Sequence, residues 1–288
     1  MLVARYATED IQSLNIELSP TLTIIVTLET FILQPGAGIL PDFVQEALRI
    51  ISEADKRGIQ LRLLGATAVK FHSPKFAYLY EDMQRALTDL DLISYARFRP
   101  LLKDFLKSLG YAADDRFIAL HGHKRQIYYD EANKRTVDIF LDKLEFCHII
   151  NFAGRLELDN PTITLADILL EKMQIVQINE KDIKDTIIML REHEVGEIEK
   201  ETVNAKYIAK RLSDDWGFYY TVTTNLKKVK DFLPEFKALD ENSRSDVASK
   251  VDRLLNYIEK ESKSFGWKMR ARVGPSKKWY TEVEEISR

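Results

Sequence analysis

The chain has 288 residues, of which 45% are hydrophobic and 30% charged, and its net charge is −3. This is the composition of an ordinary globular protein, and the charge argues against a protein that coats nucleic acid with its whole surface. The single cysteine, Cys147, excludes an intrachain disulfide and suits a reducing compartment.

The N-terminal part of the chain gives few signals. Thr21–Leu33 is rich in β-branched residues, and Gln34–Gly38 predicts a turn. The longest apolar stretch, around Leu22–Leu28, is far shorter than the roughly 20 residues that a membrane helix needs. No signal peptide is recognisable, so we expect a cytoplasmic protein with no membrane contact.

The next region alternates between helix and strand signals. Pro41–Arg57 predicts a helix, because its apolar residues recur at helical spacing and Gly58 can end it. Leu61–Leu64 is the first predicted core strand. A turn at Gly65 then leads into a helix from about Thr67, and Leu90–Ser94 is the second predicted strand.

A predicted hairpin and several helices complete the chain. The hairpin consists of Arg125–Tyr129 and Arg135–Leu141, and the acidic segment Glu194–Glu201 is the candidate linker. The remaining predicted helices cover Arg99–Leu109, Leu165–Ile178, Lys181–His193, Val203–Leu212, Leu226–Phe236 and Ser243–Ser262. We therefore predict an α/β (α+β) core over residues 1–195, a mixed sheet flanked by helices with an N-terminal extension, and a helical C-terminal region over 196–288.

The most informative motif is the pair Asp89 and Asp91. Carboxylates two residues apart on a strand point to the same face, where they repel each other unless a cation lies between them. A third carboxylate, Asp138, also alternates with apolar residues, as a strand residue does, and the hairpin places it on the strand next to the pair. Asp142, four residues on, is an alternative to Asp138. Three carboxylates beside the glycine turn are suited to holding Mg²⁺ and a nucleoside triphosphate.

An ordered set of motifs resembles the polymerase-β-type nucleotidyltransferase superfamily. The closest resemblance is to minimal nucleotidyltransferases such as the AbiEii-type toxins of toxin–antitoxin systems, over roughly residues 45 to 192. The matching residues and motifs are Gly65-Ala-Thr-Ala68, Arg85, Thr88-Asp-Leu-Asp91, Asp138, Lys172 and Lys181-Asp-Ile-Lys-Asp185. Ala66 departs from the family pattern, which has a second glycine or a serine there.

The resemblance implies a nucleotidyltransferase fold and transfer of a nucleoside monophosphate from an NTP to an acceptor hydroxyl. Asp89, Asp91 and Asp138 would be the catalytic residues and the ligands of two Mg²⁺ ions. The residues that would bind the nucleotide are Gly65, Ala66, Thr67 and Lys172. RNA, a protein or a small molecule fits as acceptor, and a toxin would also have an antitoxin as partner.

Other interpretations stay open for several of these residues. Thr67 could cap a helix, and Lys172 could extend from its apolar helix into solvent. Asp182 and Asp185 could pair with Lys172 or lie on a solvated helix face. The cationic stretch Lys268–Tyr280 could be a solvated tail or an accessory phosphate-binding patch. For the whole chain, the rival of the enzyme is a non-catalytic nucleotide- or partner-binding protein that retains the fold.

Overall fold

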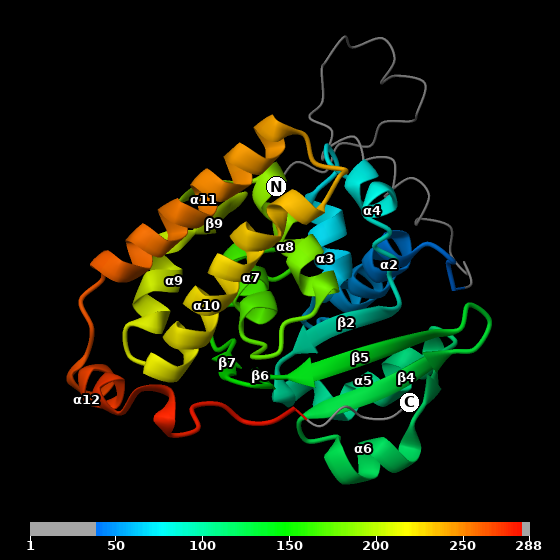
Figure 1. The fold of residues 1–288 in the computed structure, drawn as a ribbon. Coiled ribbons are helices and arrows are strands. Elements are labelled where there is room, and N and C mark those ends of the chain that lie inside the picture. The colour runs from blue at the N-terminus through cyan, green and yellow to red at the C-terminus, as the bar shows by residue number, and fades with distance from the viewer. Residues whose placement is uncertain (1–38, 284–288) are drawn as a thin grey trace. The chain divides into compact units, whose positions relative to one another are not determined.

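A five-stranded mixed sheet organises the first half of the protein, of which the computed structural model describes residues 39–283 (Figure 1). The predictions for Thr21–Leu33 and Gln34–Gly38 lie outside these residues. The strands are β1 (Leu61–Leu64), β2 (Asp89–Ser94), β3 (Ala112–Ala113), β4 (Arg125–Asp130) and β5 (Arg135–Leu141). Their order in the sheet is β1-β2-β5-β4-β3, with β2 and β5 parallel and all other neighbours antiparallel. The predicted mixed sheet and its hairpin are thus confirmed.

The two faces of this sheet differ in character. Residues that are paired across strands share a face, so Leu63, Leu92 and Ile139 lie together on one side. All three are fully buried. The alternate residues, Asp91 and Asp138, lie together on the opposite face. The period-two pattern therefore gives the sheet one apolar face for the core and one face with acidic residues.

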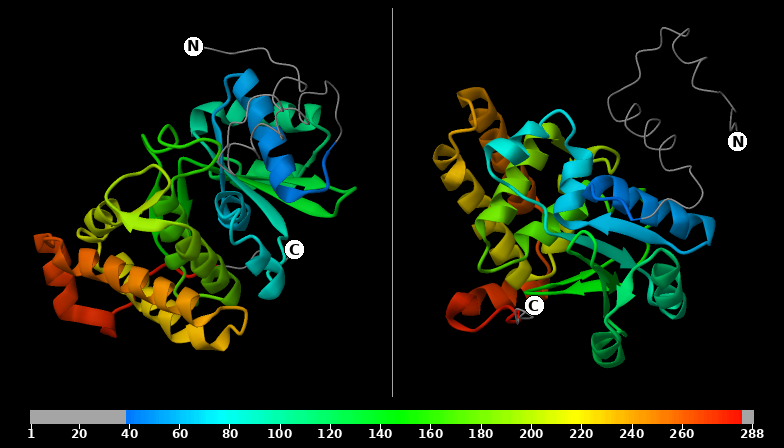
Figure 2. Two further views of the ribbon diagram at one scale, coloured as in Figure 1. Left: turned by 90° about the horizontal axis from the view of Figure 1, so that it is seen from above. Right: turned by 90° about the vertical axis from the view of Figure 1, so that its right-hand side faces the viewer.

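Five helices accompany the sheet. They are α2 (Phe43–Lys56), α3 (Gly65–His72), α4 (Tyr78–Asp82), α5 (Arg99–Ser108) and α6 (Asp115–His121). α2 packs against β1 and α3, and α5 packs against β3. α2 and α5 lie on the same side of the sheet (Figure 2). A single-turn 3-10 helix, Ala96–Phe98, precedes α5. The predicted flanking of the sheet by helices is therefore confirmed.

The second half is mainly helical. Its helices are α7 (Leu165–Met173), α8 (Glu180–Glu192), α9 (Ala205–Leu212), α10 (Trp216–Phe232), α11 (Glu241–Lys260) and α12 (Phe265–Val273). Two short strand pairs accompany them, β6 (Lys143–Glu145) with β7 (Ile149–Asn151) and β8 (Glu194–Gly196) with β9 (Thr202–Asn204). Two further 3-10 turns cover Leu233–Glu235 and Gly274–Ser276.

Helix α7 lies at the centre of the helical part, and all nine of its residues are buried. It packs against α3, α8, α9 and α10, so it joins the helices to the sheet region. The helix is shorter than predicted because the Asn225 side chain donates hydrogen bonds to the carbonyls of Met173 and Ile175, at 2.9 and 2.8 Å. These bonds satisfy carbonyl groups at the helix end and stop its continuation.

Two local predictions differ from the structure. Helix α10 begins ten residues earlier than the predicted start at Leu226, because Asp215 caps it and accepts a hydrogen bond from the Phe218 N–H at 2.9 Å. The candidate linker Glu194–Glu201 begins with β8, which pairs with β9 in parallel. The domain boundary near residue 195 stays a prediction. Among residues 39–283, no helix has the length and apolar character that a membrane crossing requires.

Candidate functional site

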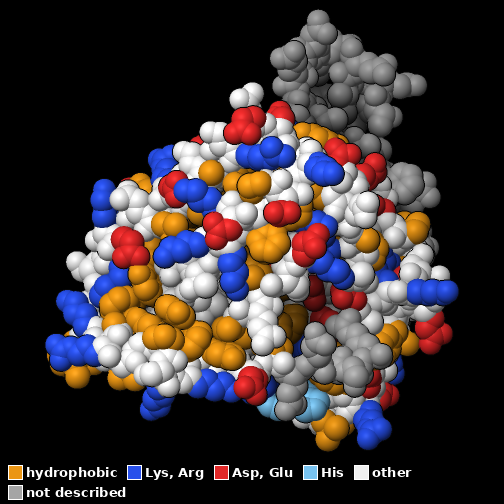
Figure 3. All heavy atoms as spheres, in the orientation of Figure 1, with side chains coloured by type: hydrophobic (Ala, Val, Ile, Leu, Met, Phe, Trp, Pro, Cys, Tyr) orange, Lys and Arg blue, Asp and Glu red, His pale blue; other side chains and the backbone are white. Residues whose placement is uncertain are grey.

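The structure brings the three predicted aspartates onto one face of adjacent parallel strands. Asp91 is directly opposite Asp138 in the pairing of β2 with β5, and Asp89 is opposite Thr136. Asp89 and Asp91 are half-buried, whereas Asp138 is fully buried. In the space-filling view, acidic side chains lie deep in a hollow between β2 and the helices above it (Figure 3). The sheet register therefore produces the predicted acidic cluster.

Asp89 is oriented by two hydroxyl groups. Thr136 Oγ1 donates to Asp89 Oδ1 at 2.6 Å, and Thr88 Oγ1 donates to Oδ2 at 3.2 Å. Two hydrogen bonds to the two carboxylate oxygens restrict the rotamer of the Asp89 side chain. Thr136 is the partner of Asp89 across the ladder, so the strand register itself supplies this contact.

Asp138 forms an ion pair with Arg125 of the neighbouring strand. Arg125 Nε lies 3.0 Å from Asp138 Oδ1 and Nη2 lies 2.9 Å from Oδ2, so both carboxylate oxygens are engaged. Arg125 is half-buried. A metal ion at Asp138 would have to share the carboxylate with Arg125 or displace it. The sequence showed this arginine beside the predicted hairpin but not its partner.

The alternative ligand Asp142 has a different place. It follows the end of β5, is exposed, and its Oδ1 accepts a hydrogen bond from the Ala96 N–H at 2.9 Å. Its backbone lies in the left-handed region, with φ of 60°. Asp142 therefore fixes the segment after β2, and Asp138 is the aspartate that lies beside the Asp89–Asp91 pair.

The pKa of Asp91 is raised by its surroundings. Burial raises its pKa to about 8, and the negative charges of Asp138, Glu171 and Asp89 add to this effect. Lys172 acts in the opposite direction but does not cancel the shift. A carboxyl group in this state gains from any cation that enters the site.

The turn at Gly65 meets Asp91 closely. Gly65 has φ of +73°, and a Cβ atom built on it would lie 2.6 Å from Asp91 Oδ2. Glycine is therefore required both by the backbone conformation and by the space. Helix α3 begins directly at this turn, with Leu64 as an N-cap residue that makes no side-chain capping bond. The positive end of the helix dipole is thus at the acidic cluster.

Glu171 is a fourth carboxylate of this site, and sequence reasoning did not single it out. It is buried on α7, and its Oε2 accepts a hydrogen bond from the Gly65 N–H at 3.1 Å. Burial raises its pKa to about 7. The N–H that was expected to hold phosphate is thus engaged by a carboxylate. The only signal for Glu171 in the sequence was its place beside Lys172 in an otherwise apolar predicted helix.

The other predicted nucleotide-binding residues are close to the same turn. The Ala66 carbonyl accepts a hydrogen bond from Tyr80 Oη at 3.1 Å. Thr67 is buried, and its Oγ1 lies 3.4 Å from the Asp89 carbonyl. Thr67 is therefore directed toward β2, and it is not the N-cap residue of α3, which is Leu64.

Lys172 belongs to a buried chain of alternating charges. Its Nζ lies 3.0 Å from Asp182 and 2.9 Å from Asp185, and Asp185 in turn forms a two-point ion pair with Arg85 at 2.8 Å. Lys172, Asp185 and Arg85 are all buried. Asp182 and Asp185 therefore pair with Lys172, which was one of the two alternatives from the sequence, and do not form a solvated helix face.

The cationic C-terminal stretch packs against α10. Trp279 Nε1 donates to Thr221 Oγ1 at 3.0 Å, and Arg270 donates to the carbonyls of Gly274 and Lys277 at 2.6 Å. All three tryptophans of the chain line a cavity of about 290 Å³ beside Arg270. Trp279 and Arg270 are thus packed, whereas Lys268, Arg272, Lys277 and Lys278 are exposed to solvent. Both interpretations of the stretch, a solvated tail and a phosphate-binding patch, stay predictions.

We compared the chain with known proteins. No protein-family model, curated protein or solved structure matches it. The functional assignment therefore depends on the residues of the acidic site.

Proposed function

We propose that the protein is a Mg²⁺-dependent nucleotidyltransferase with a nucleotidyltransferase fold. The observation that supports this most strongly is the acidic cluster of Asp89, Asp91 and Asp138 at the Gly65 turn. In this cluster, burial and the negative charges of Asp138, Glu171 and Asp89 raise the pKa of Asp91 to about 8. Carboxylate oxygens are the ligands that Mg²⁺ prefers, and a second source of ligands is the phosphate of a substrate.

The donor set fits two Mg²⁺ ions. Asp89 and Asp91 would hold both ions, and Asp138 would complete the second site near the acceptor hydroxyl. When bound, Mg²⁺ neutralises charge on the triphosphate and lowers the pKa of the acceptor hydroxyl. Thr136 and Thr88 keep Asp89 in its orientation through the hydroxyl contacts described above. The protein's own contribution is mainly positioning and electrostatics.

The Gly65 turn and α3 would bind the triphosphate. The helix N-terminus offers N–H groups and a positive dipole end to phosphate, which would compete with Glu171 for the Gly65 N–H. Lys172 lies in the next buried layer, where it balances Asp182 and Asp185. Its role would then be indirect: its charge lowers the pKa of Glu171 and Asp91.

An RNA end, a protein hydroxyl and a small molecule all fit a site of this kind as the acceptor. The resemblance to AbiEii-type toxins favours RNA or a protein, and it implies an antitoxin as a binding partner. Transfer of a nucleotide to such an acceptor would inactivate it, which is how a toxin of this class would act.

The second candidate is a non-catalytic nucleotide- or partner-binding protein that retains the fold. Two observations favour it. Arg125 already engages both oxygens of Asp138, and Glu171 already engages the Gly65 N–H. Ala66 adds a methyl group at the turn where the related family has glycine or serine. This candidate predicts that nucleotide binding, if present, leads to no transfer.

One experiment separates the two candidates. The purified protein is incubated with Mg²⁺ and each of the four labelled NTPs in an extract that contains total RNA and protein, and the labelled products are resolved. We expect label on one class of acceptor with one preferred NTP, and none when EDTA replaces Mg²⁺. Absence of label with every NTP, together with measurable NTP binding, would establish the non-catalytic protein instead.

A further inference from the structure

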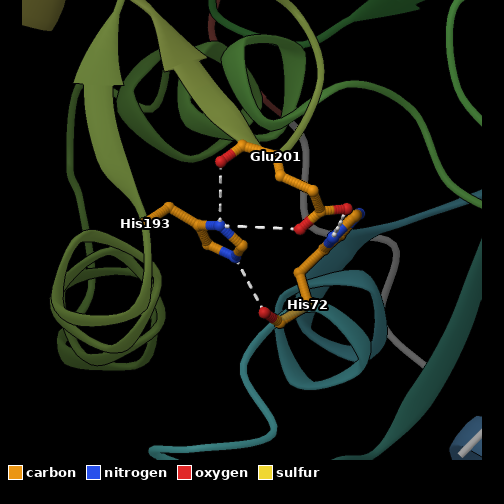
Figure 4. A group of neighbouring side chains, drawn as sticks. All are labelled: His72, His193 and Glu201. Carbon is orange, nitrogen blue, oxygen red and sulfur yellow. Dashed lines mark hydrogen bonds and ion pairs between the residues drawn. The ribbon is translucent and has the colours of Figure 1, made fainter. Parts of the chain in front are cut away.

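A second group of ligating side chains lies away from the acidic site. His72 is the last residue of α3, His193 follows α8 directly, and Glu201 precedes β9. One ligand atom of each residue lies within 4.8 Å of the others. Both imidazole rings are turned toward Glu201 (Figure 4). The fold thus unites residues that are 8 and 121 positions apart in the chain.

The hydrogen bonds of His193 determine which of its nitrogen atoms has a lone pair. Nε2 lies 2.7 Å from the carbonyl oxygen of His72. A carbonyl oxygen can only accept, so Nε2 carries the hydrogen. In the neutral ring, Nδ1 then keeps its lone pair. This atom lies 3.4 Å from the Glu201 carbonyl and 3.8 Å from its carboxylate.

His72 has the same arrangement. Its Nε2 lies 2.6 Å from Thr162 Oγ1, and its Nδ1 lies 3.7 Å from the Glu201 carboxylate. The Thr162 hydroxyl can accept from Nε2–H, which leaves the lone pair of Nδ1 directed toward Glu201. Histidines that bind metals have this arrangement: one ring nitrogen donates a hydrogen bond to the protein, and the other directs its lone pair toward the metal.

With the hydrogen on Nε2 of both neutral rings, the acceptor atoms face one another at the centre of the group. Such an arrangement is unfavourable unless a proton or a metal ion lies between the atoms. The carboxylate of Glu201 supplies the negative charge that a bound cation needs.

We propose that His72, His193 and Glu201 form a binding site for one divalent transition-metal ion of the Zn²⁺ class. Two imidazoles and a carboxylate are a ligand set that Zn²⁺ takes. Ligand atoms of a tetrahedral zinc site are about 3.3 Å apart, because each lies about 2.0–2.1 Å from the ion. The Nδ1 atoms of His72 and His193 lie 3.7 and 3.8 Å from the two different oxygens of Glu201, and the three ligand atoms lie within 4.8 Å of one another. The side chains would therefore have to move closer together, by up to about 1.5 Å, to bind one ion.

The position of the site indicates a stabilising role. The ion would hold together the end of α3, the end of α8 and the segment before β9. Glu201 is held in the left-handed region, with φ of 49°, and its side chain is 53% exposed. Solvent therefore reaches the group from this side, and a water molecule would be the fourth ligand. This site is independent of the proposed transferase activity.

The test measures Zn²⁺ binding to the full chain after removal of metal with EDTA. All proteins carry His121→Gln and His123→Gln, because these two exposed histidines could also bind Zn²⁺. We expect one Zn²⁺ per chain by calorimetry and elemental analysis, and a rise in Tm on its addition. Glu201→Gln should weaken binding by at least about 100-fold, as expected for the loss of a ligand.

Matched controls make the outcome decisive. Glu197→Gln changes a carboxylate of the same segment with nearly the same exposure, 52% against 53%, and should bind Zn²⁺ as the parent does. Asp91→Asn should also bind normally, because it alters the acidic site. His193→Gln is a second ligand variant, in case one substitution affects folding. Equal affinity in the Glu201 and Glu197 variants would overturn the proposal, as would no binding or binding that depends on Asp91.

Discussion

Two charged regions of the protein meet at helix α7, and they differ in how their charges are balanced. On the side of α8, Lys172 and Arg85 face Asp182 and Asp185, so each buried charge has an opposite partner. On the side of the sheet, burial and the negative charges of neighbouring carboxylates raise the pKa values of Asp91 and Glu171 to about 8 and about 7.

This difference in charge balance indicates that the charges on the side of α8 stabilise the fold, whereas those on the side of the sheet can bind a cation. A buried set of charges that is complete needs nothing from solution and can only be damaged by removal of a member. A set that is short of positive charge is stabilised by a cation, and its affinity for that cation comes from the same imbalance that destabilises the metal-free protein. The four predictions below test this distinction, in order of decreasing effect.

The largest effect is expected from the acidic side. Asp89→Asn or Asp91→Asn should reduce Mg²⁺-dependent transfer by at least about 1000-fold, because either change removes a ligand of the metal ions. Single-turnover rates with the preferred NTP would measure it. Folding should be preserved, since each variant removes one of several like charges. Asp142→Asn is the matched control, because this exposed aspartate caps Ala96 instead. Transfer by the Asp91 variant at the control's rate would remove Asp91 from the metal site.

In the network of paired charges on the side of α8, removal of one charge should lower the stability of the fold. Lys172→Met leaves Asp182 without its cation and Asp185 with Arg85 alone, and it should lower the free energy of unfolding by about 3 kcal/mol. Urea unfolding would measure this. The control is Lys184→Met, whose partner Glu180 is 61% exposed, and it should cost less than about 1 kcal/mol. If the two variants were equally stable, the charge chain would not contribute to the fold.

The third prediction concerns pH. The pKa of Asp91 is about 8 in the folded protein against 3.8 for an unperturbed aspartate. The folded protein therefore binds more protons than the unfolded chain between these values, and the Mg²⁺-free protein loses stability as pH rises through this window. We expect a loss of about 1–3 kcal/mol from this group.

Thermal melts in EDTA across this pH range would test the third prediction. Asp91→Asn should flatten the dependence and be the more stable protein near the upper end of the window. Mg²⁺ should raise the Tm of the parent there and have little effect on the variant. Glu171 contributes a dependence of the same sign, so the comparison with the variant isolates Asp91. An identical pH dependence of stability in both proteins would show that the pKa of Asp91 is not raised in the folded protein.

The smallest effect is expected at the turn itself. Ala66→Gly should tighten NTP binding by a modest factor if the methyl group limits the approach of phosphate. It should also cost about 0.5–1 kcal/mol of stability, because glycine has more freedom in the unfolded chain. Calorimetry with NTP and melting without it separate the two effects. Unchanged NTP affinity would show that the alanine is compatible with phosphate binding.

The sequence was sufficient for four of the five strands of the sheet and for the acidic residues on β2 and β5, but the short strand β3 was not predicted. Alternation of polar and apolar residues in β2 and β5 is a local pattern, and it predicted that Asp89, Asp91 and Asp138 share a face. The hairpin predicted that Asp138 lies on the strand next to the pair, but the parallel pairing that places Asp91 opposite Asp138 was not predicted.

Contacts between distant segments could not be predicted in the same way. Glu171 reaches Gly65 across 106 positions, and His193 reaches His72 across 121. Neither contact follows from a periodic pattern of residues along the chain. The start of α10 was also missed, since its aromatic and β-branched residues favour a strand and only packing in the helical region overrides that preference.

Helix α7 has a consequence for how the chain tolerates changes in length. Its adjacent residues Glu171 and Lys172 face the two different charged regions, and successive residues of a helix are separated by about 100°. A one-residue insertion upstream within α7 would move Glu171 to the position that faces Asp182 and the apolar Leu170 to the position that faces Gly65. The helix therefore acts as a fixed spacer, in which the number of residues is under stronger constraint than the identity of most of them.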